Sequence, residues 1–336
     1  MDRLVAIRDP EELTQWDDGT LLPPLTATDL VQHAPDAHWI LTDGRGEARG
    51  RCSLWWRRTP SLPGHRLGIL GHYAARDSGA AHRLLHHACE QLAAQGCSLA
   101  VGPMDGNTWR RYRLITERGS EPVFFLEPDN PDDWPGHFFD NGFTPLAHYS
   151  SAVNADLSRH DPRMERVAER MAVQGIRIRS LDPQRVEDGL RRIYGVSRVG
   201  FRSNFLYTPI SESEFIAQYR PLLAWVRPEL VLIAEQGDRP IGLLFVLPDL
   251  MQARRGQVID TVILKTVAVL PERGNAGLGS LLVARGHAIA RSLGYTRAIH
   301  ALMHETNNSR NISRHYAQPM RRYALFARAL RNVDYP

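Results

Sequence analysis

Residues 266–286, TVAVLPERGNAGLGSLLVARG, pass from a β-branched run through three spaced glycines to apolar positions at helical spacing. Gly274, Gly277 and Gly279 give up side chains where the backbone must turn sharply or let another group approach closely. The first backbone N–H groups of a helix lack partners and carry partial positive charge. The pattern therefore predicts an anion site suited to a phosphate or pyrophosphate. A glycine-softened turn without a ligand is the alternative interpretation.

Length and composition narrow the class of protein. A chain of 336 residues can bury a sizeable core, and its length favours two domains. No apolar run approaches the roughly 18 residues that a membrane span needs, and the acidic first residues do not resemble a signal peptide. The net charge of +4 is spread along the chain, which disfavours a nucleic-acid partner. We therefore expect a cytoplasmic protein with no membrane partner.

Cysteine and histidine spacing predicts no metal site. Cys52, Cys89 and Cys97 form neither a disulfide nor a metal pattern, as expected in a reducing compartment. His82 and His86 lie four residues apart on a predicted helix, but no third zinc ligand follows the known spacings. A solvated helix face explains this pair.

The second half of the chain predicts a mixed order of strands and helices. Ser211 and Glu214 form a capping-box pattern at the start of one helix, and Gly294 marks the end of another. The expected elements are a strand at 176–182, helices from 183 to 199 and from 211, a hairpin at 230–248, a strand at 262–270, a helix to 293, a strand at 296–305, a short helix and a last strand at 321–330.

The first half repeats much of this order. It predicts a strand at 66–74, a helix at 80–96, a strand from 97 and a closing strand within 138–153. Two tandem homologous domains explain the repetition. The predicted boundaries are a degenerate first domain at 1–153, a partly helical connector at 154–175 and a second domain at 176–336.

The second half resembles the GNAT N-acetyltransferase superfamily. VAVLPERGNAGLGSLL at 267–282 is similar to the family's acetyl-CoA motif, a strand followed by [Gln/Arg]-x-x-Gly-x-[Gly/Ala]. Gly277 and Gly279 match the two glycines, whereas Gly274 stands at the Gln or Arg position and Arg273 is one place early. The segment 305–317, ETNNSRNISRHYA, resembles the family's Asn-containing segment that ends near a tyrosine. The resemblance covers the second domain almost entirely, and the first more weakly from about residue 50 to 153.

The resemblance implies a fold and a co-substrate. The fold is α/β with a mixed α+β sheet, arranged as two tandem GNAT-like acyl-CoA N-acyltransferase domains. The co-substrate is acetyl-CoA, with its pyrophosphate at the helix N-terminus and its peptide-like pantetheine arm beside the strand edge. The residues expected to bind acetyl-CoA are Val267, Ala268, Val269, Arg273, Gly274, Asn275, Ala276, Gly277, Leu278, Gly279, Ser280, Asn307 and Asn308.

The implied reaction is transfer of acetyl to a primary amine by direct attack in a ternary complex. An amine with a pKa near about 10 is mostly protonated at neutral pH, so a general base or a water chain is expected. His304 and Glu305 are the candidate bases, with Glu235 as a further candidate, and Tyr316 is the candidate general acid. Solvated strand ends, a hairpin charge and a packed aromatic ring are the respective structural alternatives.

Two other classes of function are alternatives for this sequence. A dinucleotide oxidoreductase spaces its glycines two and then three apart, opposite to the order found here. A non-catalytic acyl-CoA-binding sensor or regulatory protein remains the alternative to an enzyme. The acceptor amine is left open, with its pocket expected around 201–207, and the oligomeric state is also left open.

The first domain is expected to bind no CoA. Aligning its loop ARDSGAAHRLL with PERGNAGLGSLL sets Asp77 against Gly274, Ala80 against Gly277 and His82 against Gly279. Side chains and a negative charge then replace the glycines of the predicted anion site. The domain is expected to brace the second one or to form a wall of its acceptor site.

Overall fold

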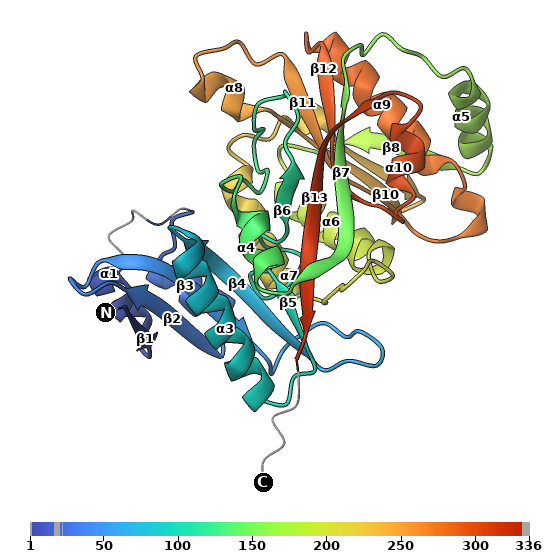
Figure 1. Cartoon of the computed structure of the whole chain (residues 1–336). Coiled ribbons are helices and arrows are strands. Elements are labelled where there is room, and N and C mark those ends of the chain that lie inside the picture. The colour runs from blue at the N-terminus through green and yellow to red at the C-terminus, as the bar shows by residue number, and fades with distance from the viewer. Residues whose placement is uncertain (1, 17–20, 22, 331–336) are drawn as a thin grey trace.

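The computed structural model describes residues 2–16, 21 and 23–330. Their strands form one 13-stranded mixed sheet in the order β1-β2-β3-β4-β5-β13-β7-β12-β11-β10-β9-β8, with β6 paired to β13. Figure 1 shows the N-terminal half in blue to green and the C-terminal half in green to red, with β7 and β13 running between them. Among the described residues, no helix combines the length and apolar character that a membrane crossing requires.

The N-terminal half contributes seven strands and four α-helices among its described residues. In chain order they are β1 (Arg3–Ile7), α1 (Leu13–Trp16), α2 (Ala27–His33), β2 (Ala37–Thr42), β3 (Ala48–Trp55), β4 (Leu67–Ala75), α3 (Ser78–Ala94), β5 (Leu99–Gly102), β6 (Leu114–Glu117), α4 (Trp134–Asp140) and β7 (Thr144–Asn154).

The C-terminal half follows the predicted order closely. Its elements are α5 (Arg163–Val173), β8 (Ile176–Ser180), α6 (Val186–Gly200), α7 (Glu212–Tyr219), β9 (Val231–Gln236), β10 (Arg239–Pro248), α8 (Leu250–Arg254), β11 (Thr261–Val269), α9 (Leu278–Ser292), β12 (Arg297–His304), α10 (Ser309–Ser313) and β13 (Gln318–Ala329).

Local signals explain where several of these elements begin and end. The Ser211 hydroxyl accepts the Glu214 N–H at 3.1 Å and caps α7, as its sequence pattern predicts. Gly294 follows α9 with φ +92°, a left-handed conformation that glycine adopts without a steric penalty. β11 pairs in parallel with β12, and α9 connects the two strands.

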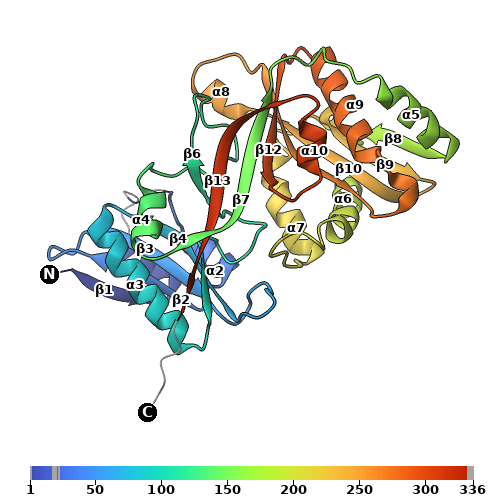
Figure 2. The ribbon, with the colours of Figure 1, turned by 45° about the vertical axis from the view of Figure 1, so that its right-hand side comes forward.

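The last strand of each half pairs with the other half. β7 pairs with β12, and β13 pairs antiparallel with β5, β6 and β7 (Figures 1 and 2). The sequence predicts both strands but not this exchange, because pairing partners far apart in the chain leave no local pattern. The sheet therefore continues through the middle of the molecule. The predicted domain boundaries remain a proposal on this background.

Helices cover both faces of the C-terminal part of the sheet. Gly279 of α9 lies near Val267 and Val269, whereas Gly200 of α6 lies near Ala268. Successive strand residues point to opposite faces, so α9 and α6 pack on opposite sides of β11. The cavity described below opens beside this strand.

A buried ionic group fixes a loop of the N-terminal half to β13. Arg321 donates to Glu127 and to the backbone carbonyls of Arg118 and Glu121, and the Tyr323 hydroxyl also donates to Glu127. The Arg321 and Glu127 side chains are fully buried. Breaking such a pair leaves an uncompensated buried charge, so β13 holds the 118–127 loop firmly.

We predict that acidification destabilises the protein through its buried histidines. His287 of α9 and His300 of β12 face each other with their Nε2 atoms 3.0 Å apart. Burial lowers the pKa of His287 to about 4, and burial together with His287 lowers that of His300 to about 3. Burial also lowers the pKa of His38 and His72. The unfolded chain therefore binds protons from about pH 6.5 downward while the folded chain does not, so the free energy of unfolding falls below that pH.

Urea unfolding at pH 7.5, 6.5 and 5.5 measures this effect. Each such histidine contributes a slope of up to about 1.4 kcal/mol per pH unit. His300→Gln should flatten the profile, whereas the exposed His65→Gln should leave its slope unchanged. A wild-type stability that is constant over this interval would contradict the prediction.

Candidate acyl-CoA and acceptor site

The site begins where β11 and β12 separate. Their parallel pairing covers only Thr261–Leu264 against Arg297–His300. Beyond it, β11 pairs with β10 on one side and β12 with β7 on the other. The facing backbone edges of β11 and β12 are therefore free to pair with a peptide-like chain.

Both strands carry irregularities at this point. In β11, Leu264 pairs with Val246 and Thr266 with Phe245, which leaves Lys265 as the extra residue of a bulge. In β12, the register shifts between His300 and Met303, and Leu302 has a left-handed φ of +57°. Bulges and left-handed non-glycine residues occur preferentially at functional sites, where they redirect side chains.

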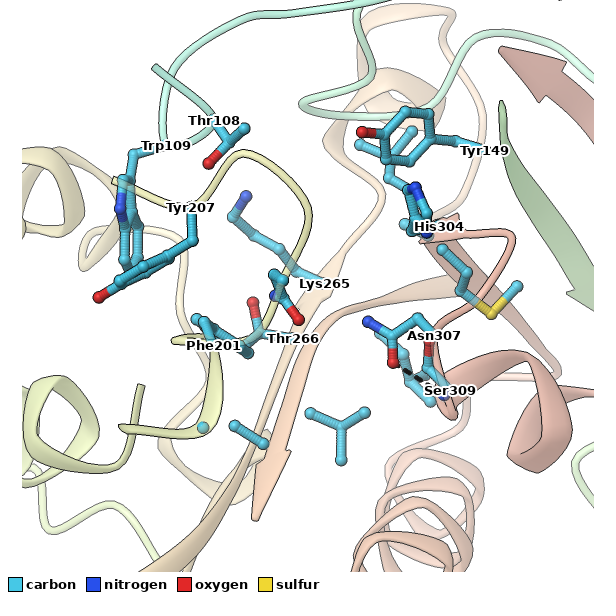
Figure 3. Close-up of a pocket in the computed structure, with 18 of the residues that line it drawn as sticks. Thr108, Trp109, Tyr149, Phe201, Tyr207, Lys265, Thr266, His304, Asn307 and Ser309 are labelled. Carbon is cyan, nitrogen blue, oxygen red and sulfur yellow. Dashed lines mark hydrogen bonds between the residues drawn. The ribbon is translucent and has the colours of Figure 1, made fainter. Parts of the chain in front are cut away.

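A cavity of about 1600 Å³ lies beside the separated strands and is lined by both halves of the chain. Figure 3 shows Trp109, Phe201 and Tyr207 on one wall and Tyr149, His304 and Asn307 on the other, with Lys265 reaching in between. The cavity exceeds the roughly 300–1,000 Å³ of ordinary small-molecule pockets. Residues 201–207, where the sequence places the acceptor pocket, contribute to this lining.

The glycine loop leads into α9 at the edge of the cavity. Gly277 is the N-cap of α9 with φ +85°, and a Cβ there would also lie 3.3 Å from Arg170 and Val167 of α5. A Cβ on Gly279 would lie 3.3 Å from Ile312 of α10, at the cavity wall. Gly274 has open space around it. Gly277 is thus required by backbone conformation, whereas Gly279 keeps side-chain atoms out of the cavity.

Most of the residues expected to bind acetyl-CoA line this cavity, and three do not. Leu278 is the first residue of α9, and its side chain is buried in the core. Arg273 and Gly274 also lie outside the lining. The Asn275 amide donates to the Leu270 carbonyl at 3.0 Å and so shapes the loop. The lining members are Val267, Ala268, Val269, Asn275, Ala276, Gly277, Gly279, Ser280, Asn307 and Asn308.

His304 is the candidate catalytic residue that lines the cavity. Its Nδ1 accepts the Thr306 N–H at 3.2 Å, so the neutral ring carries its proton on Nε2. The ring stacks on Phe205 and meets Tyr149 edge-on, and burial lowers its pKa. His304 therefore offers a neutral hydrogen-bond donor. Acting as a base through Nε2 would require the other tautomer and the loss of the bond from Thr306.

The other three candidate catalytic residues lie outside the cavity lining. Glu305 is exposed, and Glu235 is bound in ion pairs with Arg179 at 2.8 Å and Arg192 at 3.0 Å. Tyr316 is only 3% exposed, and its ring packs edge-on against His287. Its hydroxyl has no hydrogen-bond partner among the described residues. This environment corresponds to a packed aromatic ring, the structural alternative given for Tyr316 in the sequence analysis.

Sequence reasoning missed four cations that line the cavity: Lys265, Arg110, Arg111 and Arg113. Arg110 pairs with Glu214, and Arg111 donates to the Asp129 carbonyl. A signal was available for Lys265, because it is the only lysine among 41 lysine and arginine residues. Arg113 lies in a loop of the N-terminal half, and its residue type does not distinguish it from the many other arginines of the sequence. Its guanidinium packs against two rings, 3.8 Å from the centroid of Tyr112 and 4.1 Å from that of Tyr149.

We call the gap between the separated edges of β11 and β12 the slot. The corresponding slot of the N-terminal half, between β4 and β5, is filled by the chain itself. Beyond the pairing of β4 with β5, the Met104 N–H donates to the Leu70 carbonyl at 2.8 Å. A Cβ on Gly71 would lie 2.0 Å from the Met104 carbonyl oxygen, so no ligand chain fits between them. Asp77 caps α3 and accepts the Ala80 N–H at 2.9 Å. Asp77 thus corresponds to Gly277 in position, not to Gly274 as the sequence alignment suggests, and its carboxylate occupies the helix N-terminus.

Comparisons with known proteins agree with this geometry at the level of the fold. No protein-family model matches the chain. A curated relative named Bacterial ceramide synthase, from Caulobacter vibrioides (strain NA1000 / CB15N), is 25% identical over 228 residues. The matched region covers 67% of this chain and 59% of the relative, so the chain spans less than two thirds of that protein.

Two solved structures match over nearly their whole length. A tandem GNAT protein from the clavulanic acid biosynthesis pathway superposes with a TM-score of 0.53 at 14% identity, covering 99% of this chain and 100% of its own. A GCN5-related N-acetyltransferase from Sphaerobacter thermophilus gives 0.51 at 13% identity, covering 98% and 96%. The chain therefore has the α/β GNAT fold in its tandem arrangement, as the sequence resemblance implies.

We predict one acetyl-CoA site per chain. The C-terminal half keeps an open slot and has Gly277 and Gly279 at the start of α9, whereas the N-terminal half has Met104 in its slot and the Asp77 carboxylate at the start of α3. Isothermal titration calorimetry of the full chain with acetyl-CoA should give a stoichiometry of one. Two sites of comparable affinity would overturn this prediction.

Proposed function

We propose that the protein is an acyltransferase that moves an acetyl group from acetyl-CoA to a primary amine by direct attack. The observation that carries the proposal is the open slot between β11 and β12, which leads to the N-terminus of α9. A pantetheine arm can pair with the free edge at Val267–Val269, and a pyrophosphate can accept from the first N–H groups of α9. A free backbone N–H of β11 can also stabilise the oxyanion of the transition state.

The cavity supports a ternary complex. Its volume of about 1600 Å³ leaves room for an acceptor beside the acyl end of the co-substrate. A covalent route through cysteine has no support, since the three cysteines are buried and lie outside the lining. Burial raises the pKa of Cys52 to about 12 and that of Cys89 to about 11, which suppresses the nucleophilic thiolate.

Turnover separates the enzyme from a non-catalytic acyl-CoA sensor. Release of free CoA thiol is followed with acetyl-CoA and a panel of amines, and the acylated product is identified by mass spectrometry. A palmitoyl-CoA arm is included because the Caulobacter relative is named a ceramide synthase. Amine-dependent thiol release supports the proposal. Tight acetyl-CoA binding without release for any amine would favour the sensor.

We predict that Gly279→Val strongly weakens acetyl-CoA binding and lowers turnover with it. The valine would project toward Ile312 at the cavity wall, beside the expected pyrophosphate. Gly274→Ala is the matched control, because its new Cβ meets nothing closer than 3.8 Å. Calorimetry should give a Kd at least about 100-fold weaker for Gly279→Val and within about twofold for Gly274→Ala. Equal affinities in two folded variants would contradict the assignment of the loop.

We predict that, among the candidate catalytic residues, His304 is the one that matters. His304→Ala should lower kcat by about 10- to 100-fold, since it removes a donor facing the reaction cavity. Tyr316→Phe should keep kcat within about twofold, because it deletes a buried hydroxyl that bonds to nothing. Steady-state kinetics from pH 6 to 9 measures both. Wild-type rates in His304→Ala, or a large loss in Tyr316→Phe, would reverse the assignment.

A further inference from the structure

Lys265 and Arg113 are two cations that line the same cavity. Within the described part of the chain, neither the Lys265 ammonium nor the Arg113 guanidinium makes an ion pair. Buried Nε and Nη1 of Arg113 donate no hydrogen bond, although the residue is only 6% exposed. A largely buried cation without an opposite charge is costly, so an unpaired cation beside a cavity indicates an anion that arrives with a ligand.

The carboxylates of the lining cannot serve as that acceptor, because each is already engaged. Glu214 pairs with Arg110 at 3.0 Å, Glu272 with Arg239, and Glu127 with Arg321. Asp105 accepts the His72 N–H at 2.6 Å. These four are the only acidic side chains among the described lining residues. The two free cations therefore face the cavity with no internal counter-charge.

The position of Lys265 supports a role toward a ligand. The bulge in β11 places its side chain in the space between the aromatic wall and His304 (Figure 3). Burial and the neighbouring Arg113 lower the pKa of Lys265, which shows that the two charges oppose each other. An anion between them would remove both the repulsion and part of the desolvation penalty.

We propose that Lys265 and Arg113 bind an anionic group, a carboxylate or a phosphate, on the acceptor amine. This inference rests on the proposed acyl transfer and names the class of its second substrate. Trp109, Phe201 and Tyr207 form the opposite wall, with ring centroids 6.0 and 6.1 Å from Trp109 to the other two. The acceptor class is thus an amine that carries one anionic group and an apolar body.

Paired acceptors test the charge directly. Phenylalanine is compared with phenethylamine, 4-aminobutyrate with propylamine, and phosphoethanolamine with ethanolamine, each by thiol release from acetyl-CoA. In at least one pair the anionic member should have a kcat/KM higher by about tenfold or more. The carboxylate and phosphate arms distinguish the two kinds of anion. No preference for an anionic member in any pair would overturn the proposal.

Variants assign the preference to the lysine. The ratio to follow is kcat/KM for the anionic member of a pair divided by kcat/KM for its neutral member. Lys265→Met should bring this ratio close to one by lowering kcat/KM for the anionic member alone, and Lys265→Arg should retain it. Arg285→Met removes an exposed charge on α9 and should leave the ratio unchanged. An unchanged ratio in Lys265→Met would overturn the proposal. So would a change confined to succinyl-CoA against acetyl-CoA with an uncharged amine, because the anion would then belong to the donor.

A labelling experiment tests the anion site without a measurement of turnover. Because Lys265 is the only lysine in the sequence, its ε-amine is the only lysine target of an amine-reactive ester, and the modified peptide identifies it. N-acetyl-phenylalanine should protect Lys265 from modification, whereas N-acetyl-phenethylamine should not, as measured by peptide mass spectrometry. Such protection without any transferase activity would retain the anion site and reject the proposed reaction. Equal modification with both probes would reject the anion site.

Discussion

The antiparallel pairing of β7 with β13 is the contact on which the whole arrangement depends. Each strand is the last of its own half, and each also pairs with the other half: β7 with β12, and β13 with β5. Without this exchange, the edges of β5 and β12 would present unpaired backbone groups to water or to other chains. The N-terminal half is therefore retained as part of the sheet, even though its own ligand slot is filled by Met104.

The same exchange builds the walls of the cavity. Arg321 lies on β13, and its guanidinium donates hydrogen bonds to the carbonyls of Arg118 and Glu121 and to the Glu127 carboxylate. The loop fixed in this way contributes 124–128 to the lining, opposite residues of the C-terminal half. A buried ion pair adds little net stability, but separating its partners leaves an uncompensated buried charge. In this protein, the pair fixes the position of the 118–127 loop of the N-terminal half relative to the slot of the C-terminal half.

Local patterns predicted the parts of the fold that local physics determines. The glycine loop, the capped helix at Ser211 and the hairpin of β9 and β10 all appear where periodicity and turn residues indicate. The exchange of β7 and β13 could not be predicted, because a strand's alternation specifies its buried face and not its neighbour. Tyr316 shows the same limit within the site. A motif spacing placed it near the reaction, but packing against His287 directs its ring away from the cavity lining.

The choice between lysine and arginine at the site has a physical reason. Arg113 spreads its charge over a plane and gains from the faces of Tyr112 and Tyr149, so burial costs it less. Lys265 is a compact, strongly hydrated charge that no aromatic face among the described residues covers. A chain that otherwise uses arginine throughout places its single lysine at this bulge. The charge of Lys265 is therefore less compensated than that of Arg113, so an anionic group on a ligand would contribute most of its stabilisation at Lys265.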